Sequence, residues 1–357
     1  MKVGNSPDST QYKVIVGSYS SPEETGIHTF VFDGATGTLE YAGGTGGIGN
    51  PSFVTEELRD GQLFAVSEMS PEGAVVSYAI DEAAGVMIQT GRQSTRGNHP
   101  CHLHADPTGQ WLLTVNYSGG SLCLYPILEN GAVGPLSDQV FHHGSSVRAD
   151  RQSSAHPHSI IPVPGSDLWL VPDLGMDRLF LYELDRPAGK LMLRSETVVE
   201  GGAGPRHAVF HPHLPVVYVT EELGSSVGVY HLNLAGLSLE RKQQMSTLPS
   251  GWNGVSTAAE IRITRDGRYV YASNRGHDSI AAFRTGEDGS LVLIDTYSTL
   301  GRTPRHFNLD PSDRYLIAAN QHSDGIVVFS VAENGTLTAV GGPVAVNKPT
   351  CIQFYRI

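Results

Sequence analysis

Cysteine and lysine are both scarce in this chain. Three cysteines occur in 357 residues, Cys101, Cys123 and Cys351, with no spacing typical of a zinc site. An odd number of cysteines favours free thiols in a reducing compartment over a disulfide framework, so we expect a cytoplasmic protein. Only 5 of the 24 basic residues are lysine and the other 19 are arginine, whose guanidinium fork binds carboxylate and phosphate through two hydrogen bonds.

Other features are missing as well. No apolar stretch approaches the ~18 residues of a membrane span. The first ten residues, MKVGNSPDST, lack the apolar core of a signal peptide and are expected to form a frayed tail. The net charge of −12 argues against nucleic acid or an anionic membrane as a partner. The sequence also contains neither a P-loop motif nor the HExxH motif of metalloproteases.

The most informative pattern is a unit of roughly fifty residues that recurs along the chain. Each copy reads as a short strand, a turn rich in Gly, Asp or Pro, and further strands, as in residues 304–340. A copy without proline begins at Ala258. The other copies start at a proline: Pro51, Pro100, Pro157, Pro205, Pro304 and, in a partial C-terminal copy, Pro349.

Four antiparallel strands per repeat are typical of a β-propeller blade, and the copies count to seven. The N-terminal copy lacks its first strand, whereas residues 349–356 form a first strand with no continuation. We therefore predict an all-β, seven-bladed β-propeller, a single domain over residues 11–357 after a tail of residues 1–10. Residues 349–356 are expected to close the ring against the N-terminal blade. A pair of β-sandwiches is the alternative, although it gives no reason for complementary incomplete repeats at the two ends.

A polar residue recurs sixteen or seventeen positions after the start of each copy, at the end of a hydrophobic run. Core packing does not require acids and amides there, so we predict that these side chains ring the central channel and bind substrate. They are Glu68, Asn116, Asp173, Glu222, Asn274 and Asn320. Their oxygens would also suit a hard cation, which is an alternative, but we predict neither a metal nor another cofactor.

The first strand of each copy adds imidazole and guanidinium groups. The position after the proline holds His158, Arg206 and Arg305, and the next position holds His102, His207, Glu260 and His306. We expect both positions to line the channel at one level, because imidazole suits proton transfer and arginine suits anions. Arg275, next to Asn274, joins this site. The alternative for each residue is a structural contact between blades. His211 and His213 fall in the first turn and are expected on the surface.

Four long segments carry a resemblance to a known family: HPHSIIPVPGSDLWLVPDLG from His156, GAGPRHAVFHPHLPVVYVTEELG from Gly202, TAAEIRITRDGRYVYASNRG from Thr257 and TPRHFNLDPSDRYLIAANQ from Thr303. They resemble the lactonase family of seven-bladed β-propellers, which includes propeller-type 6-phosphogluconolactonases and fungal carboxy-cis,cis-muconate cyclases. The resemblance extends over essentially the whole chain, from about Tyr12 to the end.

The resemblance also implies site residues. The fungal cyclases have a proposed site of one histidine, two arginines and one glutamate, which match His158, Arg206, Arg275 and Glu222. In this chain His156 lies two residues before His158 on the same strand face and is expected to share its role. The segment 141–158 resembles a loop of one bacterial branch, which would cover the channel mouth and bring His143, Arg148 or Arg151 to the ligand.

The function implied is hydrolysis of a sugar lactone by a monomer or homodimer, with 6-phospho-D-glucono-1,5-lactone as the expected substrate. We expect His158 to act as acid or base with Glu222 as its partner, and the arginines to stabilise the oxyanion or bind an acidic group. Three alternatives stay open. They are a lactonising cyclase of the carboxymuconate type, a lactonase for an unphosphorylated lactone, which the scarcity of lysine favours, and a non-enzymatic propeller scaffold.

Overall fold

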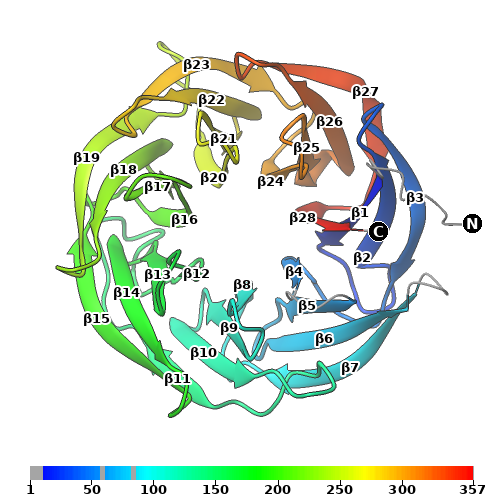
Figure 1. The fold of residues 1–357 in the computed structure, drawn as a ribbon, viewed down its shortest axis with the longest axis vertical. Helices are drawn as coiled ribbons and strands as arrows, with labels where there is room; N and C mark the ends of the chain where they lie inside the picture. The colour runs from blue at the N-terminus through cyan, green and yellow to red at the C-terminus, as the bar shows by residue number, and fades with distance from the viewer. Residues whose placement is uncertain (1–10, 57–60, 82–85, 357) are drawn as a thin grey trace, which may run out of the picture.

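The computed structural model describes residues 11–56, 61–81 and 86–356, whose strands form seven four-stranded antiparallel sheets arranged in a ring (Figure 1). The innermost strands are β4 (Val54–Glu56), β8 (Pro100–Ala105), β12 (Ile161–Pro162), β16 (Pro205–Phe210), β20 (Thr257–Ile263), β24 (Pro304–Leu309) and β28 (Pro349–Arg356). The second strands are β5 (Gln62–Ser67), β9 (Trp111–Asn116), β13 (Leu168–Asp173), β17 (Val216–Glu221), β21 (Tyr269–Arg275), β25 (Tyr315–Asn320) and β1 (Gln11–Ser18).

The outer half of each blade continues the same order. The third strands are β6 (Ala74–Asp81), β10 (Ser121–Pro126), β14 (Arg178–Asp185), β18 (Ser226–Asn233), β22 (Ser279–Thr285), β26 (Gly325–Val331) and β2 (Ile27–Asp33). The outermost are β7 (Val86–Ser94), β11 (Asp138–Phe141), β15 (Lys190–Val198), β19 (Ser238–Ser246), β23 (Leu291–Ser298), β27 (Leu337–Ala345) and β3 (Thr38–Thr45), and a 3₁₀ turn follows β25 at Gln321–Ser323. The predicted seven-bladed β-propeller is confirmed, whereas the tail expected for residues 1–10 lies outside the described residues.

The ring closes as the incomplete repeats predicted. Strand β28 pairs with β1 in antiparallel register, with Tyr12 opposite Arg356 and Gly17 opposite Cys351. The C-terminal strand therefore supplies the innermost strand of the blade that begins at the N-terminus (Figure 1). Hydrogen bonding between the two ends removes the free sheet edge that an open ring would leave.

The burial of each strand follows from its distance to the axis. The second strand β13 is buried at every position, because a neighbouring blade covers each of its faces. The outermost strands alternate instead, as in β15, where Leu191 is buried and the flanking Lys190 and Met192 are exposed. The hydrophobic core thus lies between blades, and large side chains such as Trp169 fill it. This packing fixes the inner strands around the axis.

The inner strands carry an irregularity where functional side chains were expected. The register between first and second strands shifts at Pro100/His102, Pro205/Ala208, Ala258/Ile261 and Pro304/His306. Such β-bulges change the direction in which a side chain points and are common beside active sites. In these four blades the bulge falls at the residues that were expected to line the channel.

Candidate active site

One cavity on the propeller axis gathers most of the charged residues of the channel. It has a volume of about 160 Å³ and is lined by Glu68, Cys101, Tyr117, Arg151, His158, Glu222, Arg275 and Arg305. We call it the axial cavity. All but one of these residues come from two repeat positions, the residue after the starting proline and the residue that follows the second strand or ends it. The exception is Arg151, which lies in residues 142–160 between β11 and β12, here called the mouth loop.

Glu222 is the electrostatic centre of the axial cavity. It directly follows β17 and is buried. Its Oε2 lies 2.7 Å from Arg275 Nη2 and 3.0 Å from Arg206 Nε, and its Oε1 lies 2.6 Å from Arg151 Nη2. Burial opposes its charge, but Arg275, Arg206 and Arg151 outweigh burial and lower the pKa of Glu222 to about 2. Glu222 is therefore a permanent carboxylate and cannot donate a proton near neutral pH.

Arg206 and Arg275 each have N–H groups that make no hydrogen bond within the described residues. Arg206 Nε is close to Glu222 but poorly aligned for a hydrogen bond, and within the described residues its Nε and Nη1 have no acceptor. Arg275 Nε likewise has no hydrogen-bond acceptor among the described residues. Burial, and then the charge of Arg275, lowers the pKa of Arg206 to about 10, so it remains protonated at neutral pH. These unpaired N–H groups are suited to an oxygen that gains negative charge during a reaction.

His158 is a neutral imidazole in this setting. It precedes the short strand β12, and its backbone N–H donates to Pro172 O at 3.0 Å. Burial, followed by the charge of Arg206, lowers the pKa of His158 well below its ordinary value of 6.5. The expected pairing with Glu222 is wrong, since the three arginines take up the Glu222 oxygens. His158 Nδ1 lies 3.9 Å from Cys101 Sγ.

Cys101 is a structural thiol despite its place in the axial cavity. Burial raises the pKa of Cys101, so the thiol stays protonated, and its Sγ donates to His158 O at 3.3 Å. A nucleophilic cysteine requires the thiolate. Cys101 therefore fixes the backbone of the neighbouring blade and does not provide a nucleophile.

The opposite wall of the axial cavity holds a second carboxylate and a free cation. Glu68 accepts hydrogen bonds from Tyr19 Oη at 2.9 and 3.0 Å and from Ser52 Oγ. The guanidinium carbon of Arg305 lies 5.4 Å from the centre of the Tyr19 ring. Within the described residues Arg305 makes no ion pair or hydrogen bond. Four arginines thus surround two carboxylates at the axial cavity, and the excess positive charge favours an anionic ligand.

Three of the predicted ring residues, all asparagines, face away from the channel. The Nδ2 atoms of Asn116, Asn274 and Asn320 donate to backbone carbonyls at the end of the preceding blade, on Thr95 (3.1 Å), Thr247 (2.7 Å) and Thr299 (2.9 Å). The prediction that they bind substrate is therefore wrong. The physical reason is the alternation of side chains along a strand. Glu68 and Glu222 stand seventeen residues after the repeat begins and these asparagines sixteen, so they point to opposite sides.

Asp173 shares the sixteen-residue spacing and anchors the mouth loop. Its carboxylate lies 2.7 Å from His142 Nδ1 and accepts from His156 N at 2.8 Å, so it holds both ends of that loop. His156 stacks on Tyr117 with ring centres 4.4 Å apart and donates from Nδ1 to Tyr117 O at 2.9 Å. The expectations that Asp173 binds substrate and that His156 shares the role of His158 are both wrong, because these residues position others.

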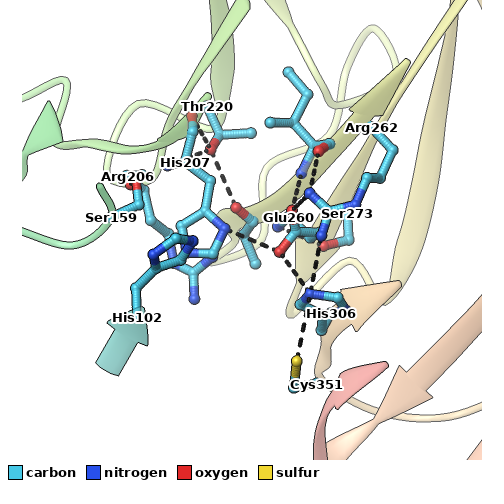
Figure 2. Close-up of polar contacts among 12 residues, drawn as sticks. His102, Ser159, Arg206, His207, Thr220, Glu260, Arg262, Ser273, His306 and Cys351 are labelled. Atoms are coloured by element: carbon cyan, nitrogen blue, oxygen red, sulfur yellow. Dashed lines mark hydrogen bonds and ion pairs between the residues drawn. The ribbon is translucent and has the colours of Figure 1, made fainter. Parts of the chain in front are cut away.

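His102 and His207 also lie apart from the axial cavity. With Glu260, Arg262 and His306 they form a second layer further along the channel, where the Glu260 carboxylate lies between His207 and His306 (Figure 2). Glu260 Oε2 is 2.9 Å from His207 Nδ1 and 3.2 Å from His306 Nε2, and its Oε1 contacts Arg262. This layer draws on four blades and borders a different cavity, of about 390 Å³. The first strands therefore present two levels, not one.

Sequence reasoning missed two residues of the axial cavity. Tyr117 occupies the same seventeen-residue position as Glu68 and Glu222, and Cys101 the same position as His158, so the repeat alignment contained a signal for both. Arg151 lies outside the repeat and was one of three loop residues expected near the ligand; the structure places it on Glu222. No group of three or more metal-binding side chains is arranged to hold an ion within the described residues. No helix there is long and apolar enough to cross a membrane.

The chain is similar to known proteins in both sequence and structure. The sequence profile described as "Lactonase, 7-bladed beta-propeller" matches residues 13–354. The chain is 32% identical over 305 residues to a 6-phosphogluconolactonase of Bacillus subtilis, covering 85% of this chain and 86% of that protein. Among solved structures, a putative 6-phosphogluconolactonase from Bacteroides fragilis has a TM-score of 0.91 at 28% identity, covering 98% and 99% of the two chains. A periplasmic gluconolactonase from Pseudomonas aeruginosa has a TM-score of 0.90 at 28% identity, covering 97% and 99%.

Proposed function

Because this chain belongs to the family of seven-bladed β-propeller lactonases, we propose that it hydrolyses 6-phospho-D-glucono-1,5-lactone at the axial cavity. Relatives named 6-phosphogluconolactonase and gluconolactonase support lactone hydrolysis as the reaction class. The observation that carries the proposal is that neutral His158 and the guanidinium group of Arg275 line one small cavity, with Arg206 held beside them by Glu222. The excess of guanidinium groups over carboxylates there supports an anionic substrate.

The chemistry required is the addition of water to the lactone carbonyl and cleavage of the ring C–O bond. His158 accepts a proton from the attacking water, for which its neutral state is required. Arg206 and Arg275 stabilise the oxyanion that forms on the carbonyl oxygen. The tetrahedral intermediate collapses, the protonated His158 returns the proton to the departing ring oxygen, and the new carboxylic acid loses its proton to water. Glu222 holds the arginines in place and stays ionised throughout.

Replacing His158 tests the assignment. We expect His158→Gln to lower kcat for 6-phospho-D-glucono-1,5-lactone by about 10²- to 10⁴-fold, the usual contribution of a general acid–base residue. Acid release from freshly prepared lactone, corrected for spontaneous opening, measures the rate. The matched control is His213→Gln, an exposed histidine in a turn outside the axial cavity. Wild-type activity in His158→Gln would remove His158 from the mechanism.

We also propose that the protein is cytoplasmic and that its partner is this small-molecule substrate. The thiols of Cys101, Cys123 and Cys351 are all free and buried, which suits a reducing compartment. Cell fractionation with an antibody to the chain tests the location, and recovery outside the cytoplasm would contradict it.

A further inference from the structure

The mouth loop holds the backbone of Arg151 in a fixed position. Gln152, the next residue, is fully buried, and its Nε2 donates to Leu174 O at 2.9 Å. Its Oε1 accepts from Arg148 N at 3.1 Å, and its own N–H donates to Arg148 O at 2.6 Å. A tight turn with a buried anchor thus carries Arg151, so only the side chain of Arg151 is free to move.

The side chain of Arg151 reaches Glu222 from the solvent side. Its Nη2 lies 2.6 Å from Glu222 Oε1 and 3.3 Å from Tyr117 Oη. The Arg151 side chain is 35% exposed, against 3% for Arg206 and 15% for Arg275. Partly exposed ion pairs exchange partners at small cost, whereas buried ones do not. Of the three arginines on Glu222, Arg151 is the one best able to leave it for a ligand.

Arg305 supplies the second half of an anion site. It lines the same cavity, and within the described residues it contacts the Tyr19 ring without any ion pair or hydrogen bond. Its N–H donors are therefore available. A phosphate monoester carries close to two negative charges at neutral pH and accepts the forked hydrogen bonds of guanidinium groups. An unphosphorylated sugar lactone has neither this negative charge nor the phosphate oxygens that accept the forked hydrogen bonds of a guanidinium group.

We propose that Arg151 selects phosphorylated over unphosphorylated lactones, and this rests on the proposed lactonase function. The Arg151 guanidinium leaves Glu222 Oε1 for the phosphate of the substrate, and Arg305 binds the same phosphate. Arg206 and Arg275 remain on Glu222, so the groups assigned to the carbonyl stay in place. Arg151 is accordingly a specificity residue that contacts the part of the substrate away from the reacting bond.

Kinetics with two lactones test the proposal. The ratio of kcat/KM for 6-phospho-D-glucono-1,5-lactone to that for D-glucono-1,5-lactone is measured in the wild type, Arg151→Gln and Arg151→Lys. We expect this ratio to fall roughly 10- to 100-fold in Arg151→Gln, mainly through KM for the phosphorylated lactone, the range expected for lost hydrogen bonds to a charged group. Arg151→Lys keeps the charge and should recover part of the loss. Arg148→Gln is the matched control, because Arg148 lies on the same loop but pairs with exposed Asp150.

The outcomes separate this proposal from the proposed function. An equal loss of kcat/KM for both lactones, or no loss for either, would overturn the role of Arg151. If the wild type hydrolyses neither lactone, the proposed function fails, and thermal denaturation with inorganic phosphate decides on the anion site alone. Phosphate should then raise the Tm of the wild type and Arg148→Gln but not that of Arg151→Gln. An equal rise in all three proteins would overturn the site.

Discussion

Replacing Glu222 with glutamine removes the carboxylate that three arginines share while keeping the shape of the side chain. The drop in the pKa of Glu222 from 4.5 to about 2 corresponds to roughly 3 kcal/mol of stabilisation of the folded protein at neutral pH. Glu222 is only 3% exposed, so water screens this interaction little. Breaking a buried ion pair by removing one partner typically costs about 3–5 kcal/mol, which agrees with that figure.

Thermal and denaturant unfolding of Glu222→Gln measure this cost. With an unfolding entropy of about 2.1 cal/mol/K per residue, a loss of 3 kcal/mol in a chain of 357 residues lowers Tm by roughly 4 °C. The folded-state pKa is depressed, so the contribution of Glu222 is complete above pH 4.5 and is lost as pH falls toward 2. The stability gap between wild type and variant should therefore narrow across that window.

The control for this experiment is Glu200→Gln. Glu200 is exposed and pairs with exposed Arg241 at 3.3 Å, so its removal should change stability by less than about 0.5 kcal/mol. The reasoning fails if Glu222→Gln is as stable as the wild type at pH 7. It also fails if the gap between wild type and variant stays constant from pH 7 down to pH 3.

Three further predictions follow from other parts of the molecule. Asn320→Ala should lose about 1–3 kcal/mol of stability, because the carbonyl of Thr299 loses its 2.9 Å partner, and should keep its kcat/KM; a collapse of activity at unchanged Tm would contradict a structural role. The kcat of the wild type should be flat between pH 6 and 8, since the lowered pKa of His158 keeps the imidazole neutral throughout; a fall centred near pH 6.5 would contradict that. Deleting residues 349–357 removes β28 and should abolish cooperative thermal unfolding, whereas a native-like Tm would show that the ring does not depend on its closure.

The fold could be predicted because its information is local and repeated. Each blade carries its own strands and turns, and the complementary ends at residues 11–18 and 349–356 allow only one way to complete the seventh sheet. The turn before Tyr315 shows how local this code is. Asp310 accepts from the backbone N–H of Ser312 at 3.0 Å and of Tyr315 at 2.7 Å, so its carboxylate spans the Pro-Ser-Asp turn of residues 311–313.

The site could be predicted only as far as the repeat specifies it. Alignment brought His158, Arg206, Glu222 and Arg305 to the channel, but it could not separate Glu222 from Asn116, because one residue of offset decides the side of the strand. The alignment also predicted one channel level where the structure has two, because a bulge in β16 places Arg206 in one level and His207 in the other. The contact between Arg151 and Glu222 joins residues 71 positions apart, one of them outside the repeat, so it depends on the folded ring.

A crystal structure of the wild-type protein with 6-phosphogluconate bound tests the central claim most directly. We expect the product in the axial cavity, with its carboxylate beside Arg206 and Arg275 and within reach of His158, and its phosphate on Arg305. Product bound instead in the cavity beyond His207 and Arg262, or outside the ring, would contradict the account, because the groups assigned to the reaction would then be remote from the lactone carbon.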